Sequence, residues 1–185
     1  MNLKEQSARH ALAYVRDDMV LGLGTGSTHA YFLELLGEQL QTGALTGIVG
    51  VPTSEGTAGR ARALGIPLAA RADHARLDLV VDGADEVDND LNLIKGLGRA
   101  MLREKIVEIH ADRFVVVVDE SKMVQRLGRG PFPVDVVPFG LEAQLRWLNT
   151  LGCRAELRLE KDGSPVITDD GNYMALCQFP DGIVD

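Results

Sequence analysis

The sequence predicts an α/β protein with a Rossmann-like, mostly parallel sheet covered by helices on both faces, followed by a smaller α+β (ferredoxin-like) domain. The first indication is the alternation of short apolar runs with helical patterns over residues 3–118, because strands joined by crossover helices give that order. The second is the apolar run at 77–81, which ends close to a glycine, as a strand buried on both faces does. The third is the Gly-Arg-Gly-Pro segment at 128–131, after which the order of elements changes.

The spacing of apolar residues predicts helices at 3–17, 29–41, 54–64, 99–110 and 141–151. Short apolar or β-branched runs predict strands at 19–23, 47–51, 66–68, 77–82, 114–118, 134–137, 154–159, 166–168 and 173–178. Gly65 follows the third helix and is expected to end it. The fourth helix is expected to turn Leu102, Ile106 and Ile109 inward.

These elements predict two domains. We expect a Rossmann-like catalytic domain over residues 1–127 and a small α+β domain, built on an antiparallel sheet, over 128–185. The last elements of the small domain are strands with no closing helix, which would leave one face of its sheet uncovered. The pattern therefore predicts that the small domain is incomplete at its carboxyl end.

Composition excludes several classes of partner. The formal net charge of -8 argues against a nucleic-acid or anionic-membrane partner, because both require a basic surface. A small anion remains a fitting ligand, since helix N-termini and a few lysines make a local positive site. Cys153, Cys177 and the four histidines lack metal-ligand spacing, so we expect no metal and reduced thiols of a cytoplasmic protein. Residues 1–16 lack the apolar core of a signal peptide, and no run approaches the length of a membrane span.

The first candidate binding segment is the loop Thr25-Gly26-Ser27-Thr28, which joins a predicted strand to a predicted helix. Its glycine lets the backbone approach a ligand, and its hydroxyls lie at a helix N-terminus, which suits phosphate. An ordinary strand–helix turn with Ser27 as N-cap explains the loop equally well. The loop lacks the lysine of a Walker A motif, and His29 replaces the last glycine of a dinucleotide-binding motif.

The second candidate is the acidic segment Asp82-Gly83-Ala84-Asp85 at the carboxyl end of the predicted central strand. Ligands bind at this edge of open α/β sheets, and carboxylates beside an apolar sheet are costly unless they have a role. A solvated acidic turn is the alternative, but the position at a strand end favours function for Asp82 and Asp85. The acidic residues that follow, namely Glu86, Asp88 and Asp90, are expected to face solvent.

Three further charged residues could take part in chemistry. Lys95 precedes Gly96-Leu97-Gly98, and a lysine on such a loop can contact an anion or a developing oxyanion. Glu104 lies on the next predicted helix and could act as a general base, although an exposed charge partner is the more common role of a helical glutamate. Lys122 follows a buried strand and is either a surface lysine or a second cationic contact.

Five ordered motifs together resemble one known family. They are Gly-Leu-Gly-Thr-Gly-Ser-Thr at 22–28, Val-Asp-Gly-Ala-Asp-Glu at 81–86, Ile-Lys-Gly-Leu-Gly at 94–98, Leu-Arg-Glu-Lys-Ile-Val at 102–107 and Asp-Glu-Ser-Lys at 119–122. The chain resembles ribose-5-phosphate isomerase type A of the pentose phosphate pathway. The resemblance runs from the first helix to the end of the chain.

The resemblance implies a metal-free and cofactor-free interconversion of ribose 5-phosphate and ribulose 5-phosphate through an enediolate. It implies that Glu104 carries the proton between C1 and C2, that Asp82 assists ring opening and hydroxyl proton transfer, that Asp85 orients the sugar and that Lys95 stabilises negative charge on oxygen. It also implies a homodimer or homotetramer. The substrate-binding residues that it implies are Thr25, Gly26, Ser27, Thr28, Gly83, Ala84, Gly96, Leu97, Gly98 and Lys122.

Two departures from the family pattern and two rival functions follow from the same residues. Leu97 occupies a position where many relatives have glycine, so its side chain is expected to point away from the ligand. Relatives continue for some tens of residues beyond the last residue.

Glucosamine-6-phosphate deaminases share a Thr-Gly-Ser loop but carry Asp-Gly-His where this chain has Asp-Gly-Ala-Asp. A sugar-phosphate-sensing regulator would carry a helix-turn-helix segment and a basic face, and the sequence has neither.

Overall fold

The computed structural model describes residues 2–183. The chain forms two compact units that follow spatial contacts rather than chain order. The first unit runs up to Gly83 and resumes over Arg103–Ser121, whereas the second comprises Ala84–Leu102 and the chain from Lys122 onward. The domain boundary that the sequence suggests at residue 128 stays a prediction.

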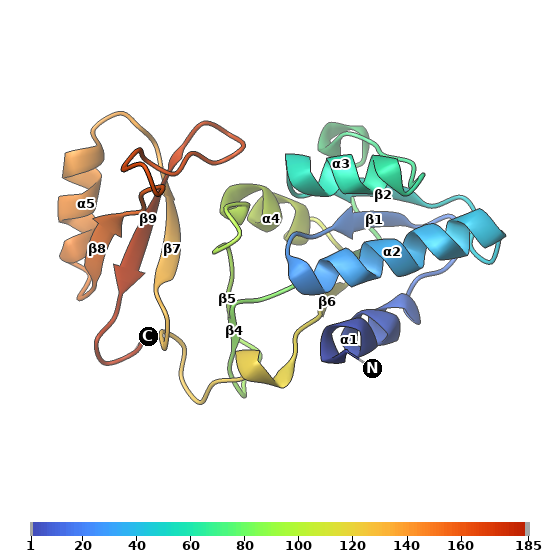
Figure 1. Cartoon of the computed structure of the whole chain (residues 1–185), viewed down its shortest axis with the longest axis horizontal. Coiled ribbons are helices and arrows are strands. Elements are labelled where there is room, and N and C mark those ends of the chain that lie inside the picture. The colour runs from blue at the N-terminus through green and yellow to red at the C-terminus, as the bar shows by residue number, and fades with distance from the viewer. Residues whose placement is uncertain (1, 184–185) are drawn as a thin grey trace. The chain divides into compact units, whose positions relative to one another are not determined.

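The first unit contains a four-stranded sheet in which every neighbouring pair is parallel. The strand order is β2-β1-β3-β6, with β1 first in the chain but second in the sheet. Figure 1 labels β1, β2 and β6 of this sheet. The prediction of a parallel α/β sheet is confirmed. The strands are β1 (Val20–Leu23), β2 (Val49–Pro52), β3 (Leu79–Asp82) and β6 (Phe114–Val116).

Four helices accompany this sheet: α1 (Leu3–Leu12), α2 (Ser27–Thr42), α3 (Glu55–Ala63) and α4 (Met101–Glu108). Local chemistry sets their ends. Asn2 and Ser54 cap α1 and α3 by accepting the backbone N–H groups of Lys4 and Thr57. Gly65, with φ of 73°, lies just beyond α3 as expected, because the left-handed conformation that ends a helix suits glycine.

Alternate strand residues point to opposite faces of the sheet, and both faces are buried. Leu21, Leu23 and Val81 belong to a core shared with residues of α1 and α2 such as Ala8 and Phe32. Strand residues of intervening register, Val51 and Val80, pack with Leu77 and with Val107 of α4 on the other face. Both faces of the sheet are therefore covered, as the sequence predicts.

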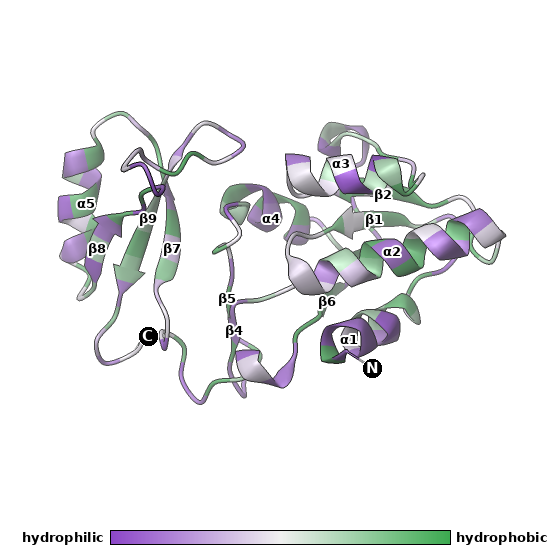
Figure 2. Cartoon of the chain, viewed as in Figure 1, coloured by the Kyte–Doolittle hydropathy of each residue, from purple (hydrophilic) through white to green (hydrophobic). Residues whose placement is uncertain are grey.

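The second unit contains an antiparallel sheet of order β7-β9-β8, formed by β7 (Phe132–Val136), β8 (Arg154–Leu157) and β9 (Tyr173–Gln178). Helix α5 (Leu141–Asn149) supplies Leu148 to the core of this sheet, which also includes Val136, Ala175 and both cysteines. Hydrophilic and hydrophobic residues alternate around α5 (Figure 2), as expected for a helix that packs on one side. The α+β expectation for this region is confirmed.

Several expected elements differ from the structure. Residues 66–68 and 166–168 form isolated bridges at Leu68 and Ile167 instead of strands. The antiparallel hairpin of β4 (Glu86–Val87) and β5 (Leu93–Ile94) was missed, because two-residue strands carry no periodic signal. Short 3₁₀ turns at Arg71–Asp73 and Glu120–Lys122 were missed as well.

The expected inward face of α4 is wrong. Leu102, Ile106 and Ile109 are 40%, 40% and 62% exposed, whereas Glu104 and Val107 are buried. The helix thus turns a carboxylate inward, and a pattern based on apolar residues selects the opposite face. Within residues 2–183, no helix combines the length and apolar composition needed to cross a membrane.

Candidate active site

Asp82 holds the loop after β1 against the end of β3 by hydrogen bonds. Its side chain is fully buried, and its Oδ1 accepts the backbone N–H groups of Thr25 at 2.9 Å and Gly83 at 2.6 Å. Gly24 lies directly against this carboxylate, and a Cβ at residue 24 would overlap Asp82. The glycine is therefore required for close approach, and the two strand ends form one rigid corner at the carboxyl edge of the sheet.

A cluster of hydroxyl groups continues this corner. Thr25 Oγ1 lies 2.8 Å from Thr53 Oγ1 and donates to Ser54 Oγ at 2.9 Å. Thr57 Oγ1 donates to the carbonyl of Gly24 at 2.8 Å, which ties α3 to the same loop. Thr53, Ser54 and Thr57 were not predicted from the sequence, although a Thr-Ser pair between a strand and a helix start is a recognisable signal.

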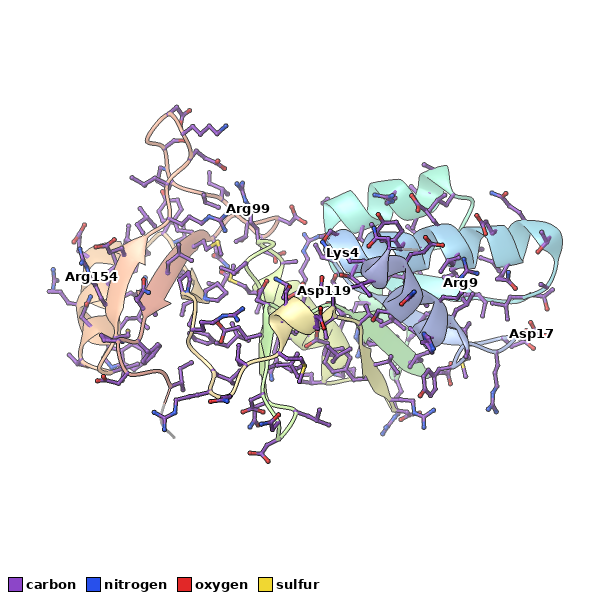
Figure 3. The ribbon with its side chains drawn as sticks, turned by 60° about the horizontal axis from the view of Figure 1, so that its bottom comes forward. Lys4, Arg9, Asp17, Arg99, Asp119 and Arg154 are labelled. Carbon is purple, nitrogen blue, oxygen red and sulfur yellow. The ribbon has the colours of Figure 1, made fainter. Side chains whose placement is uncertain are left out.

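The N-terminus of α2 lies beside a cationic side chain. Gly26 is the N-cap with φ of 117° and no side-chain cap, so the alternative in which Ser27 is the N-cap is wrong. Ser27 begins the helix, and its Oγ accepts a hydrogen bond from Lys4 Nζ at 2.8 Å. Figure 3 labels Lys4. A cavity of about 420 Å³ is lined here by Lys4, Ser27 and Arg60, among others.

This combination of a helix N-terminus, hydroxyl groups and an ammonium group suits an anion. Arg60 is engaged by Glu34 at 2.5 Å, so Lys4 is the cation bonded to the loop itself. Lys4 was missed from the sequence because α1 was treated only as an amphipathic helix. The available signal was a lysine in the first turn of α1, where it adds nothing to the helix dipole.

Glu104 lies on α4 in the first unit and is only 4% exposed. The alternative of an exposed surface charge is therefore wrong. Its neighbour Arg103 forms an ion pair with Glu55 at 2.8 Å, so the adjacent positions of α4 differ in role. A buried carboxylate is costly to maintain in a fold unless contacts or chemistry compensate.

In the second unit, Asp85 organises the loop that follows β5. Its Oδ2 accepts the N–H of Leu97 at 2.9 Å, and its own N–H donates to the carbonyl of Ile94 at 2.7 Å. Lys95 begins this loop and is half-buried. Gly96 has φ of 103°, and a Cβ there would overlap Met101. Asp85 therefore shapes the segment that carries Lys95.

Glu86 overturns the expectation of a solvent-facing charge, because it is only 4% exposed. Its carboxylate accepts the consecutive N–H groups of Gly128 at 2.7 Å, Arg129 at 3.2 Å and Gly130 at 2.6 Å. A segment without strand partners needs acceptors for its backbone donors, and Glu86 supplies them. Asp90 is exposed as expected.

Asp88 is half-buried and accepts hydrogen bonds from Asn92 and from the N–H of Asp90. The side-chain hydrogen bond from Asn92 lowers the pKa of Asp88 below its ordinary value.

The candidate residues thus form two sets, each inside one compact unit. In the first unit the structure joins Asp82 to Thr25 and Gly83 by hydrogen bonds, and Ser27 to Lys4. In the second unit it joins Asp85 to Leu97. The other candidates lie on the same segments or near them: Gly26, Thr28 and Glu104 in the first unit, and Ala84, Lys95, Gly96, Gly98 and Lys122 in the second.

An open parallel sheet with a buried aspartate and an anion-binding helix N-terminus at its carboxyl edge is the arrangement of α/β proteins that bind phosphorylated small molecules. Residues 49–185 match the family model of ribose 5-phosphate isomerase A (phosphoriboisomerase A). The ribose-5-phosphate isomerase A of Roseiflexus castenholzii is 52% identical over 177 residues, which cover 95% of this chain and 76% of that protein. The chain belongs to the ribose-5-phosphate isomerase A family.

Solved structures agree with this assignment. A D-ribose-5-phosphate isomerase in complex with phospho-erythronic acid has a TM-score of 0.96 and 46% identity, and the match covers 100% of this chain and 82% of that one. The ribose 5-phosphate isomerase of Plasmodium falciparum has a TM-score of 0.94 and 39% identity, over 99% of this chain and 80% of that one.

Proposed function

We propose that this chain is an enzyme that interconverts D-ribose 5-phosphate and D-ribulose 5-phosphate, an aldose–ketose isomerisation in the non-oxidative branch of the pentose phosphate pathway. The observation that carries the proposal is the similarity, over the whole chain, to a D-ribose-5-phosphate isomerase solved with phospho-erythronic acid. That relative binds a phosphorylated acyclic acid, which supports a phosphorylated sugar as the substrate here. Family membership supports the same reaction.

The N-terminus of α2 is the proposed site of the phosphate group. The backbone amides after Gly26, the hydroxyls of Ser27 and Thr28, and the Lys4 ammonium all suit a dianion. Thr25 is held by Asp82 and by the hydroxyl cluster, which fixes the loop before the ligand binds. Because few groups need to be ordered on binding, this preorganisation favours affinity.

Glu104 is the proposed base of the isomerisation. It takes the proton from C2 of the open-chain aldose as the C1 carbonyl becomes an enediolate oxygen, and returns the proton to C1 as the C2 carbonyl forms. The burial of Glu104 supports this role, because a base that is shielded from water keeps the transferred proton. Lys95 is the proposed partner of the negative charge that develops on oxygen.

Further contacts complete the proposal. Asp82 assists ring opening and moves the hydroxyl proton, and Asp85 orients the sugar. Gly83, Ala84, Gly96, Gly98 and Lys122 are proposed to contact substrate. Leu97 has a different role, because its N–H donates to Asp85 inside the protein. It shapes the loop from which the neighbouring residues contact substrate.

The quaternary structure is a separate proposal. We infer a homodimer or homotetramer, as the family resemblance implies, and a cytoplasmic location. Two exposed aromatic residues near α5 support an interface, since Phe139 is 92% and Trp147 61% exposed. The free thiols of Cys153 and Cys177 are consistent with a reducing compartment. Light scattering of the purified protein tests the oligomer, and a monomer at micromolar concentration would contradict it.

The function is tested by assaying ribose 5-phosphate isomerisation with and without a chelator. We expect turnover that the chelator leaves unchanged, because the proposed proton transfer uses side chains alone. Glu104→Gln should abolish turnover, since an amide cannot accept the proton. Glu38→Gln, an exposed glutamate of α2, is the matched control and should behave as wild type. A wild-type protein that leaves ribose 5-phosphate unchanged would overturn the proposal.

A further inference from the structure

In the loop 95–98, both backbone groups of Leu97 form hydrogen bonds to charged side chains. The N–H of Leu97 donates to Asp85 Oδ2 at 2.9 Å, and the carbonyl of Leu97 accepts a hydrogen bond from Arg158 Nη1 at 2.9 Å. Both partners are charged groups, and such hydrogen bonds are stronger than those between neutral groups. The loop is therefore fixed by side chains from two distant parts of the second unit.

The backbone conformation of this loop explains why it needs such partners. Gly96 has φ of 103°, and Arg99 has φ of 77°, a value that is unfavourable for a residue with a Cβ. The N–H of Arg99 returns to the carbonyl of Gly96 at 2.9 Å, which closes a tight turn around Leu97. Arg99 also forms an ion pair with Glu160 at 2.5 Å. A loop with this backbone strain persists only where surrounding contacts define it.

The backbone of Arg158 is itself held by two hydrogen bonds. Its N–H donates to the carbonyl of Met174 at 2.8 Å, and its carbonyl accepts the N–H of Val166 at 3.0 Å. Its half-buried side chain passes Met174 Sδ, which lies 3.3 Å from Nη1. Among residues 2–183, no carboxylate forms an ion pair with Arg158, whereas Arg99 and Arg154 each have one. The guanidinium group is thus directed to the Leu97 carbonyl and not to a charge partner.

Because the peptide unit is planar, the hydrogen bond from Arg158 to the Leu97 carbonyl also sets the direction of the Gly98 N–H. The carbonyl of Leu97 and the N–H of Gly98 belong to one planar unit and point in opposite directions, so a group that orients one orients the other. In the same way, Asp85 fixes the plane shared by the Gly96 carbonyl and the Leu97 N–H. Two consecutive peptide planes after Lys95 are therefore set by Asp85 and Arg158.

We propose that Arg158 is a positioning residue for the isomerisation, which aims the Gly98 N–H and steadies the Lys95 loop through its hydrogen bond to Leu97. The proposal rests on the proposed function, in which Gly98 contacts substrate and Lys95 stabilises the oxyanion. Amide donors aimed at developing charge lower a barrier only when their direction is fixed in advance. Loss of Arg158 should therefore affect the rate more than the binding of substrate.

The experiment compares Arg158→Met and Arg158→Lys with wild type. We expect kcat of the Met variant to fall about 10- to 100-fold, because small misplacement of catalytic groups has effects of this size. Its KM should change by less than about threefold, since the phosphate site lies on other residues. The Lys variant keeps the charge and one donor and should recover part of the rate. Hydrogen exchange of the peptide covering 95–99 should be faster in the Met variant.

Arg154→Met is the matched control, because Arg154 begins β8, the strand that ends just before Arg158, but is exposed and pairs with Glu156 at 2.7 Å. Figure 3 labels Arg154 and Arg99 in this unit. The control should keep wild-type kcat, KM and exchange. A merely structural role for Arg158 would lower the melting temperature and the active fraction, and would leave kcat per folded molecule unchanged.

The outcomes separate this inference from the proposed function. A wild-type protein that does not isomerise ribose 5-phosphate overturns the function, and the role of Arg158 in catalysis falls with it. A wild-type protein that does isomerise, together with an Arg158→Met variant of unchanged kcat and exchange, overturns the role of Arg158 alone. Should the Met variant fail to fold, the Lys variant decides, and wild-type kinetics in it would contradict the proposal.

Discussion

Gly24→Ala is the sharpest test of the corner between β1 and β3. The new Cβ would overlap the Cβ, Cγ and Oδ1 of Asp82. Asp82 has no room to withdraw, because it is fully buried and its Oδ1 holds the N–H groups of Thr25 and Gly83. The substitution must therefore strain the corner or break one of these hydrogen bonds.

The magnitude follows from the two costs. Overpacking a buried site costs about 1–3 kcal/mol, and losing one hydrogen bond to a charged acceptor costs about 1.5–3 kcal/mol. We expect a loss of about 3 kcal/mol in the free energy of unfolding, which corresponds to a fall in melting temperature of about 6–12 °C for a chain of this size. Isomerase activity should fall as well, since the loop at Thr25 moves with Asp82.

The assay is thermal unfolding followed by circular dichroism, with Gly59→Ala as the matched control. Gly59 lies inside α3, and a Cβ there meets nothing within 4 Å. Because alanine favours the helix over glycine by about 1 kcal/mol, the control should melt at or above the wild-type temperature. A Gly24→Ala protein that melts with wild type would refute the close approach of Asp82 to the loop.

Three further predictions concern other parts of the molecule. Glu86→Gln should lower the free energy of unfolding by about 1–3 kcal/mol, because the amide cannot accept all three backbone N–H groups from Gly128 to Gly130; urea titration measures this, and an unchanged midpoint would contradict it. Lys4→Met should raise KM for ribose 5-phosphate about 3- to 10-fold with little effect on kcat, whereas the exposed Lys105→Met should change neither. Burial, together with the hydrogen bond to Cys153, raises the pKa of the Cys177 thiol from 9.0 to about 12. The neutral thiol is therefore favoured in the folded state, so this contribution to stability is complete below pH 9 and is lost as the pH rises toward 12. Melting temperatures measured over that range should fall less steeply in Cys177→Ala, and equal slopes would contradict the prediction.

The parallel sheet could be predicted because its strands have strong local signals. Three of the four residues of β3 are apolar and all four are buried, and β9 of the antiparallel sheet is found with the predicted bounds of 173–178. Gly65 could be assigned as a helix stop because the left-handed conformation selects for glycine. These are features in which neighbouring residues determine the structure.

Features that depend on distant partners could not be predicted in this way. Glu86 looks like a surface charge until the N–H groups of residues 128–130 are brought to it. The orientation of α4 was wrong for the same reason, since only the packed sheet decides that Val107 and Glu104 face inward. Lys4 was missed because its partner, Ser27, lies in another helix.

The candidate site depended on motifs more than on periodicity. Asp82 and Asp85 could be chosen from their position after a strand, and both proved to hold backbone amides of glycine-containing loops. The chemical roles proposed for them, for Lys95 and for Glu104 stay predictions. Arg158 had no signal in the sequence, because its role arises from a contact with Leu97 across 61 residues of chain.

The most direct test of proton transfer by Glu104 uses ribose 5-phosphate labelled with deuterium at C2. With wild-type protein in ordinary water, NMR should detect ribulose 5-phosphate in which part of the label has moved to C1, because one carboxyl group removes and returns the hydrogen. Glu104→Gln should form no labelled product, while it still binds ribose 5-phosphate with an affinity close to that of wild type. Label transfer at the wild-type rate in the Glu104→Gln protein would contradict the account.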